Sequence, residues 1–258
     1  MKKKKDDVKI YIAVHKKCSL PNIEGYIPLQ VGKEGKTDLG FIGDNTGDNI
    51  SSKNPNYCEL TGMYWMYKNV KCNIIGLVHY RRYFFKGMFQ HKMSDIISCD
   101  EIKNILQEYD VIVPKKFLVR EKSNYENYKK LEHIEDLETC RDVISELTPE
   151  YLDSFDLACK KRYFYPYNMC ILKKQQFDSY AEWLFKILFE VEKRVDITNY
   201  SDYDKRIFGF LSERLFNVWL LKNNNLKVKE MYVYNIENSI LKQVCIDFIK
   251  NIVIGNKD

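Results

Sequence analysis

Apolar residues along this chain form short β-type runs in its first half, separated by stretches with helical spacing. Residues 8–14 (VKIYIAV), 74–78 (IIGLV) and 110–113 (DVIV) are apolar and rich in β-branched residues, which predicts buried strands. Residues 55–69 and 100–108 predict helices between them, the first with an apolar stripe at Leu60, Met63, Tyr64 and Tyr67. Strands that alternate with helices in this way predict an α/β fold.

The second half of the chain has mainly helical patterns. Residues 120–160 are polar without strand signals, residues 177–191 and 205–222 are amphipathic, and residues 240–254 predict a closing helix. Two further strands are predicted at residues 168–172 and 227–233. We therefore expect a basic tail at residues 1–7, one domain at 8–235 with a central, mostly parallel sheet and a helical C-terminal subregion, and a C-terminal helix at 236–258.

The composition narrows the class of protein. With 45% hydrophobic residues in 258, the chain has enough apolar material for a core, which excludes a disordered protein. A net charge of +5, from 41 basic and 36 acidic residues, is small for a general nucleic-acid binder, so we expect no nucleic-acid partner. It permits an anionic ligand.

The cysteines and the hydropathy of the chain indicate in which part of the cell the protein works. The eight cysteines include no CxxC pair, and no stretch approaches the length of a membrane-spanning helix. We expect a cytoplasmic protein with reduced thiols. The lysines at residues 2–5 and the basic closing helix either contact the inner face of the cell membrane or only solubilise the chain.

Basic and aromatic residues follow two of the predicted strands. The motif GLVHYRRYF at residues 76–84 places His79, Arg81 and Arg82 directly after a buried run, and residues 8–14 likewise lead into His15 and Lys16. Polar groups at the carboxyl ends of buried strands commonly build ligand sites, and guanidinium groups match phosphate oxygens. The alternative is an exposed basic strand end that makes surface salt bridges.

The segment DNTGDNIS at residues 44–51 lies in a long glycine-containing region. Short polar residues around a glycine make turns through their own side-chain hydrogen bonds. The alternative is a loop in which Asp44, Asp48 and Asn49 bind sugar hydroxyls or a cation. The acidic spacing does not fit an EF-hand.

Other polar residues are candidates for chemistry. Glu59, Thr61 and Trp65 lie on one flank of the helix predicted at 55–69, Asp136 lies near His133, and Glu213 lies off the apolar stripe of a helix. Each has an ordinary structural interpretation, as core or solvated charge. Nucleotide-binding glycine motifs and the common hydrolase motifs are absent. Cationic and aromatic groups at strand ends suit a phosphorylated, ring-bearing ligand such as a nucleotide sugar.

Five ordered blocks of the sequence resemble one bacterial family. They are IAVHKK (12–17), GDNTGDNISSKNPNYCELTGMYWMYKN (43–69), GLVHYRRYF (76–84), YNMCILKKQQFDSYAEWLF (167–185) and RIFGFLSERLFNVWL (206–220). The family is that of capsular and exopolysaccharide biosynthesis glycosyltransferases long catalogued as a domain of unknown function. The resemblance implies a glycosyltransferase-A-like fold, a UDP-sugar donor carrying galactose or galactofuranose, and a lipid-linked glycan acceptor.

The chain departs from the Asp-x-Asp motif typical of glycosyltransferases of this fold, which holds a divalent metal. The comparable strand ends in His79-Tyr80-Arg81, and we hypothesise that Arg81 and Arg82 replace the metal, so that no cofactor is required. The alternative is that Asp44 and Asp48 hold Mn²⁺ or Mg²⁺.

We expect an inverting transfer with a carboxylate as the base. The candidates for the base are Glu213, Asp136 and Asp48. The expected donor-binding residues are His15, Lys16, Asp44, Asn49, Glu59, Thr61, Trp65, His79, Arg81, Arg82 and Asn168. The alternative function is a non-catalytic nucleotide-sugar or carbohydrate-binding assembly protein.

Overall fold

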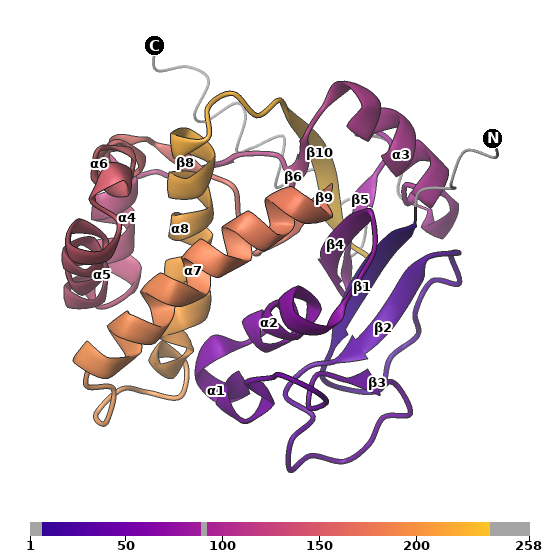
Figure 1. Cartoon of the computed structure of the whole chain (residues 1–258), viewed down its shortest axis with the longest axis horizontal. Helices are drawn as coiled ribbons and strands as arrows, with labels where there is room; N and C mark the ends of the chain where they lie inside the picture. Colours follow the sequence, from indigo (N-terminus) through magenta and orange to yellow (C-terminus); the bar gives the residue numbers. More distant parts are fainter. Residues whose placement is uncertain (1–6, 89–91, 238–258) are drawn as a thin grey trace.

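A computed structural model describes residues 7–88 and 92–237 of the chain (Figure 1). Its main sheet has the order β3-β2-β1-β4-β5-β10-β6-β9. The strands of this sheet are β1 (Val8–Val14), β2 (Tyr26–Gln30), β3 (Ile42–Gly43), β4 (Ile74–His79), β5 (Arg82–Phe85), β6 (Val111–Pro114), β9 (Cys170–Lys173) and β10 (Val228–Asn235). A separate pair consists of β7 (Phe117–Leu118) and β8 (Tyr163–Phe164). The α/β class expected from the sequence is confirmed.

The prediction that the sheet is mostly parallel is wrong, because the sheet is mixed. Strands β1, β2, β3 and β4 run parallel, as do β6 and β10. By contrast, β9 pairs antiparallel with both β4 and β6, and β5 pairs antiparallel with β4 and β10. Because β9 also contacts β4, strands β4, β5, β10, β6 and β9 form a closed ring. Strand β9, from the second half of the chain, thus lies between β4 and β6, two strands from the first half.

Buried strands alternate their side chains between two apolar layers. In β1, Tyr11 and Ala13 belong to one core, whereas Ile10, Ile12 and Val14 belong to the other. The same alternation occurs in β6, where Val111 and Val113 face the first core and Ile112 the second. Strands buried on both faces read as continuous apolar runs, which explains why the sequence identified them.

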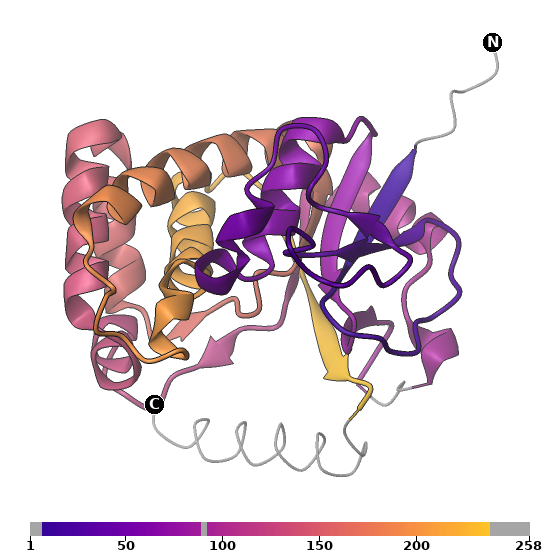
Figure 2. The same ribbon diagram turned by 90° about the horizontal axis from the view of Figure 1, so that it is seen from below.

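Helices cover both faces of the sheet. They are α1 (Asn54–Tyr57), α2 (Leu60–Asn69), α3 (Cys99–Glu108), α4 (Asn124–Leu131), α5 (Ile134–Leu147), α6 (Leu152–Lys160), α7 (Lys174–Arg194) and α8 (Ile207–Lys222). Residues of α2, α7 and α8 join the first core, and α3 contributes Ile102 and Leu106 to the second. Helices α4, α5, α6 and α8 form a helical layer beside the sheet, with α7 running from the sheet across that layer (Figures 1 and 2).

The single helix predicted at residues 55–69 is wrong, since the structure divides it into α1 and α2. The break falls at Cys58, whose φ of 51° lies in the left-handed region. The predicted closing helix at 240–254 and residues 1–6 of the basic tail lie outside the described residues. Among the described residues, no helix combines the length and apolar character needed to span a bilayer.

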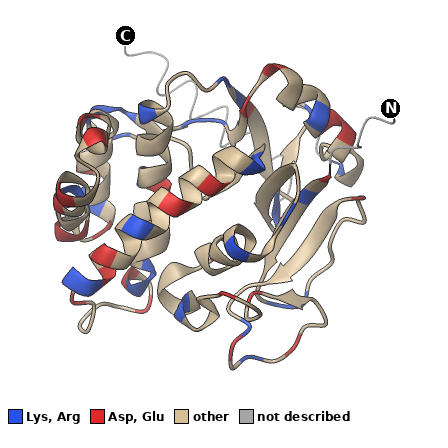
Figure 3. Ribbon diagram, in the orientation of Figure 1, with Lys and Arg blue, Asp and Glu red and all other residues tan. Residues whose placement is uncertain are grey.

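Charged residues of both signs are interspersed along α5 and α7 (Figure 3). Arg194, at the end of α7, bonds Glu146 of α5 through two nitrogens, at 2.8 and 2.7 Å, and also bonds Glu190 on its own helix. Arg141, Lys174 and Lys193 on these two helices also pair with acidic neighbours, whereas Lys186 bonds the Leu147 carbonyl.

Candidate active site

A cleft of about 760 Å³ opens where β1 and β4 end. The loops that follow the two strands supply one wall, and α1, the turn before α8 and α8 itself supply the rest. The residues that line it are Ala13, His15, Val31, Asn54, Pro55, Cys58, Glu59, His79, Tyr80, Arg81, Arg82, Tyr167, Asp202, Tyr203, Lys205, Arg206, Phe210 and Glu213. Because β1 and β4 are parallel neighbours, their carboxyl ends meet at one edge, as expected for ligand sites in α/β sheets.

The strand-end wall is cationic. His15 follows β1 and stands edge-on to Tyr80, with 5.1 Å between ring centroids. The Arg81 guanidinium lies 5.6 Å from the Tyr80 ring, and that of Arg82 lies 4.7 Å from the Tyr167 ring. Burial, and then the charge of Lys16, lower the pKa of His15, so its imidazole is neutral at pH 7. The fixed positive charge of this wall therefore comes from the arginines.

Tyr167, in the loop before β9, connects this wall to α8. Its backbone carbonyl bonds His79 Nε2 at 2.7 Å, and its backbone N–H donates to Glu213 Oε1 at 2.9 Å. A carbonyl can only accept, so this bond assigns the proton of His79 to Nε2. Burial lowers the pKa of His79, consistent with a neutral ring.

Asn168, the next residue, bonds α8 and Glu59 from a buried position. Its side-chain amide donates to Glu59 Oε1 at 2.8 Å and to the Gly209 carbonyl at 3.1 Å, and its oxygen accepts from the Ser212 hydroxyl at 2.6 Å. Asn168 is 5% exposed. Its three hydrogen bonds therefore hold the loop before β9 against α8 and orient the Glu59 carboxylate.

Three carboxylates, Glu59, Asp202 and Glu213, line the cleft. Burial raises the pKa of Glu213 to about 7, against the opposing effects of the Arg214 charge and the Tyr167 N–H. A carboxylate with this pKa exchanges a proton near neutral pH, as a general base must. Glu213 thus has the chemistry expected of a base.

Backbone strain coincides with the cleft. Among the described residues, the non-glycine residues with positive φ are Cys58, Tyr167 and Asn168, at 51°, 77° and 51°. Cys58 and Tyr167 line the cleft, and Asn168 bonds Glu59 within it. Strained backbone of this kind persists where the surroundings hold it in place, and it clusters at functional sites.

The residues of the DNTGDNIS segment mostly bond within their own loop. Asp44 is fully buried and accepts from the backbone N–H groups of Gly32 and Lys33, at 2.8 and 3.1 Å, and from the Ser51 hydroxyl. Gly32 has a φ of 60°, and a Cβ there would lie within 2.4 Å of Asn54 atoms, so only glycine fits. The segment therefore ties the long loop together, as in the turn interpretation.

Two other residues of this segment bond side chains of the neighbouring helix α2, and a third bonds within the segment. Thr46 accepts from the indole of Trp65 at 2.9 Å, Asp48 accepts from the Tyr64 hydroxyl at 3.0 Å, and Asn49 bonds the Gly47 carbonyl. Trp65 packs edge-on against Tyr11 in the core. None of these side chains lines the cleft.

Three further predicted residues lie away from the lining of the cleft. Thr61 is buried on α2 and bonds the Cys58 carbonyl at 3.2 Å. Asp136 is buried on α5 and accepts from the Tyr200 hydroxyl at 3.0 Å. Lys16 is exposed, with its amine 5.0 Å from the Tyr80 ring. The structure thus groups His15, Glu59, His79, Arg81, Arg82 and Glu213 in the cleft, with Asn168 behind them.

Sequence reasoning missed the helical wall. Tyr203, Lys205, Arg206, Phe210 and Tyr167 line the cleft, yet none was a predicted site residue. Arg206 and Tyr167 each begin one of the sequence blocks described above, which was the available signal. Nothing in the pattern distinguished them from ordinary surface residues.

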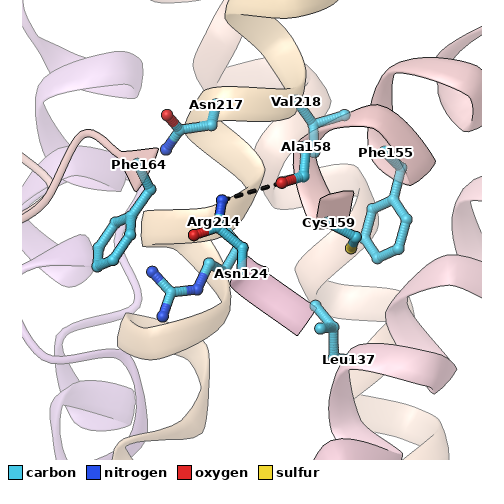
Figure 4. Close-up of a pocket in the computed structure, with 9 residues that line it drawn as sticks. All are labelled: Asn124, Leu137, Phe155, Ala158, Cys159, Phe164, Arg214, Asn217 and Val218. Carbon is cyan, nitrogen blue, oxygen red and sulfur yellow. Dashed lines mark hydrogen bonds between the residues drawn. The ribbon is translucent and has the colours of Figure 1, made fainter. Parts of the chain in front are cut away.

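A second cavity lies among α4, α6 and α8 (Figure 4). Its lining includes Asn124, Phe164 and Arg214, and its volume of about 10 Å³ is about that of one water molecule. The Arg214 guanidinium lies 3.6 Å from the centre of the Phe164 ring and bonds Asn127 at 2.8 Å. This cavity is too small for a sugar, so the larger cleft is the candidate active site.

Potential metal ligands do not gather in the described part of the chain. No group of three His, Cys, Asp or Glu side chains with metal-binding geometry occurs there. Both Asp44 oxygens already accept hydrogen bonds from groups that point their protons at them. These bonds engage Asp44 in holding its own loop together.

Comparisons with known proteins match most of the chain. The model of a family described as a domain of unknown function (DUF4422) matches residues 9–224. Among solved structures, the chain is similar to the apo structure of the WbbM bifunctional glycosyltransferase, with 33% identity and a TM-score of 0.85. The match covers 90% of this chain and 46% of that one, so this chain spans less than half of that protein's length. No curated protein matches the chain.

Proposed function

Since this chain belongs to the DUF4422 domain family and folds like part of a bifunctional glycosyltransferase, we propose that it is itself a glycosyltransferase with a glycosyltransferase-A-like fold. The proposed reaction moves galactose or galactofuranose from a UDP-sugar to a lipid-linked glycan in capsular or exopolysaccharide synthesis. The protein would work in the cytoplasm, at the inner face of the membrane where such an acceptor is anchored.

The observation that carries this proposal is that cationic side chains and a carboxylate line the same cleft. Arg81 and Arg82 supply fixed cations at the strand ends, and Glu213 supplies a half-buried carboxylate on α8. The Tyr167 backbone links the Glu213 side to His79, one residue before the Tyr80-Arg81-Arg82 segment. A transferase needs both elements at a short separation, a cation for the leaving diphosphate and a base for the acceptor.

In the proposed reaction, the arginines stabilise the leaving group. The bond between the anomeric carbon and the β-phosphate oxygen breaks, and UDP departs with the electron pair and an additional negative charge. Guanidinium groups donate two parallel hydrogen bonds to phosphate oxygens, so Arg81 and Arg82 suit this role without a metal. The three hydrogen bonds that Asp44 accepts from Gly32, Lys33 and Ser51 support the metal-independent form of the proposal.

Glu213 is the proposed base. An acceptor hydroxyl attacks the anomeric carbon from the face opposite UDP and transfers its proton to the Glu213 carboxylate, which inverts the configuration. The Tyr167 N–H holds one oxygen of Glu213 in position. Asp48 and Asp136 are less suitable, because neither lines the cleft.

The proposed donor site comprises His15, Glu59, His79, Arg81, Arg82 and Asn168, with Lys16 at its edge. His79 is a neutral hydrogen-bonded ring, and Asn168 orients the Glu59 carboxylate toward the cleft. In this proposal Asp44, Asn49, Thr61 and Trp65 act indirectly, by holding the loop and helix that border the donor.

The test is a panel of UDP-, GDP- and CDP-sugars. Thermal unfolding identifies which nucleotide binds the native state, since such a ligand raises the unfolding temperature with concentration. Release of UDP is then measured with and without a lipid-linked acceptor. We expect stabilisation by a UDP-sugar and acceptor-dependent release of UDP. Binding without release would instead indicate the non-catalytic nucleotide-sugar-binding protein.

A further inference from the structure

Two aromatic rings from the helical wall lie together at the cleft. Tyr203 precedes the 3-10 turn Asp204–Arg206, and Phe210 lies in the first turn of α8. Their ring centroids are 5.2 Å apart, and the Arg206 guanidinium lies 5.6 and 5.5 Å from the two rings. We call Tyr203, Arg206 and Phe210 the aromatic shelf.

The shelf is open to solvent, unlike the other rings of the cleft. Tyr203 is 56% exposed, whereas Tyr80 is 6% exposed and has the Arg81 guanidinium near its ring. The Tyr167 ring has Arg82 4.7 Å from its centre. A large exposed aromatic in a cleft is a ready surface for a ligand with an apolar face.

The segment that carries Tyr203 is fixed in place. Ser201 bonds the Asp204 carboxylate at 2.7 Å, and the Lys205 carbonyl accepts from the Asn56 side chain at 2.9 Å. The ring of His133 stacks on Tyr200 at 3.9 Å. A ring held by such anchors loses little freedom when a ligand stacks on it.

The shelf adjoins the proposed base. Phe210 and Glu213 are three residues apart on α8, so they are neighbours on one helix face, and both line the cleft. The donor phosphates are proposed to bind at the strand ends, which leaves the helical wall beside Glu213 for the second substrate.

We propose that the aromatic shelf is the acceptor subsite, where the C–H face of a pyranose ring stacks on Tyr203 and Phe210. This inference rests on the proposed function and adds the acceptor's place in the cleft. Arg206 has guanidinium N–H donors, and the nearby Asp202 and Lys205 line the same cleft, so sugar hydroxyls find partners around the rings. The stacked sugar presents a hydroxyl to Glu213.

The test compares Tyr203→Ala with Tyr203→Phe and with Leu131→Ala, whose side chain is about as exposed, at 57%, but lies outside the cleft. Saturation-transfer NMR measures binding of methyl β-galactopyranoside, and calorimetry measures binding of UDP. We expect Tyr203→Ala to weaken pyranoside binding roughly fivefold, as for loss of one aromatic contact, and to leave UDP affinity within about twofold. The other two variants should match the wild type.

Three results would overturn the acceptor subsite. They are no pyranoside binding by the wild type, equal binding by Tyr203→Ala, and loss of UDP affinity in Tyr203→Ala, which would indicate that the nucleobase stacks there. Failure of the proposed function gives a different result, namely shelf-dependent pyranoside binding by a wild type that releases UDP from no donor. The two failures are therefore distinguishable.

Discussion

Replacing Glu213 by glutamine separates the catalytic role of this residue from its effect on stability. Glutamine has nearly the same shape and can still accept the Tyr167 N–H bond of 2.9 Å, but it cannot take up a proton at neutral pH. General bases contribute typically about 10²- to 10⁴-fold to rate. We expect Glu213→Gln to lower kcat by a factor in this range and to leave the affinity for UDP nearly unchanged.

The same substitution should not weaken the fold at alkaline pH. Burial raises the pKa of Glu213 from 4.5 to about 7 in the folded protein. The folded state therefore binds the proton more tightly, and stability contributed by this group is present below pH 4.5 and lost as pH rises through 7. That loss is at most about 3 kcal/mol, since the side chain is only partly shielded from solvent. Glutamine removes it, so the variant should unfold at an equal or higher temperature at pH 8.

The assay is UDP release against pH. In the wild type, kcat should rise about tenfold from pH 6 to pH 8, following ionisation of a group with a pKa near 7. The residual activity of Glu213→Gln should lack this dependence. A variant with near-normal turnover, or one that keeps the wild-type pH profile, would refute Glu213 as the base.

Four further predictions concern the surrounding residues. Arg82→Ala should lower kcat/KM by roughly 10²-fold, as for loss of one donor to the developing charge, and Arg82→Lys should recover part of it in the same UDP-release assay. Transfer should persist in EDTA, and activity that is lost and then restored by Mn²⁺ would contradict the arginine proposal. Asp44→Asn should lower the free energy of unfolding by about 2 kcal/mol in urea titrations, because one acceptor oxygen of a fully buried group becomes a donor. Asn168→Ala should lower the free energy of unfolding by about 1–3 kcal/mol in urea titrations, because three hydrogen bonds are lost, and it should also lower kcat. A variant with wild-type turnover would show that Asn168 is not part of the site.

Much of the fold was accessible from the sequence because its central strands are buried on both faces. The runs at residues 8–14 and 74–78 became β1 and β4, and the helices after residue 174 followed their apolar stripes. The mixed sheet was not accessible. Insertion of β9 beside β4 is a pairing between residues about 100 apart, and no local pattern encodes it.

The sequence allowed site residues to be grouped only where the order of the strands determines their position. His15, His79, Arg81 and Arg82 could be grouped because parallel strands place their carboxyl ends at one edge. Asp44 and Trp65 could not be assigned, because the sequence does not reveal whether a polar group bonds its own loop or a ligand. Tyr203 was missed for a similar reason, since an exposed tyrosine in a turn has no periodic signature.

The central claim is that fixed guanidinium groups hold the donor diphosphate. Calorimetric titration of UDP and of uridine in EDTA tests it directly, using the wild type and the double variant Arg81→Ala/Arg82→Ala. Our account predicts that the wild type binds UDP without metal, that the double variant loses this affinity, and that uridine binds both proteins equally. UDP binding that requires Mn²⁺ and is indifferent to the double substitution would contradict it.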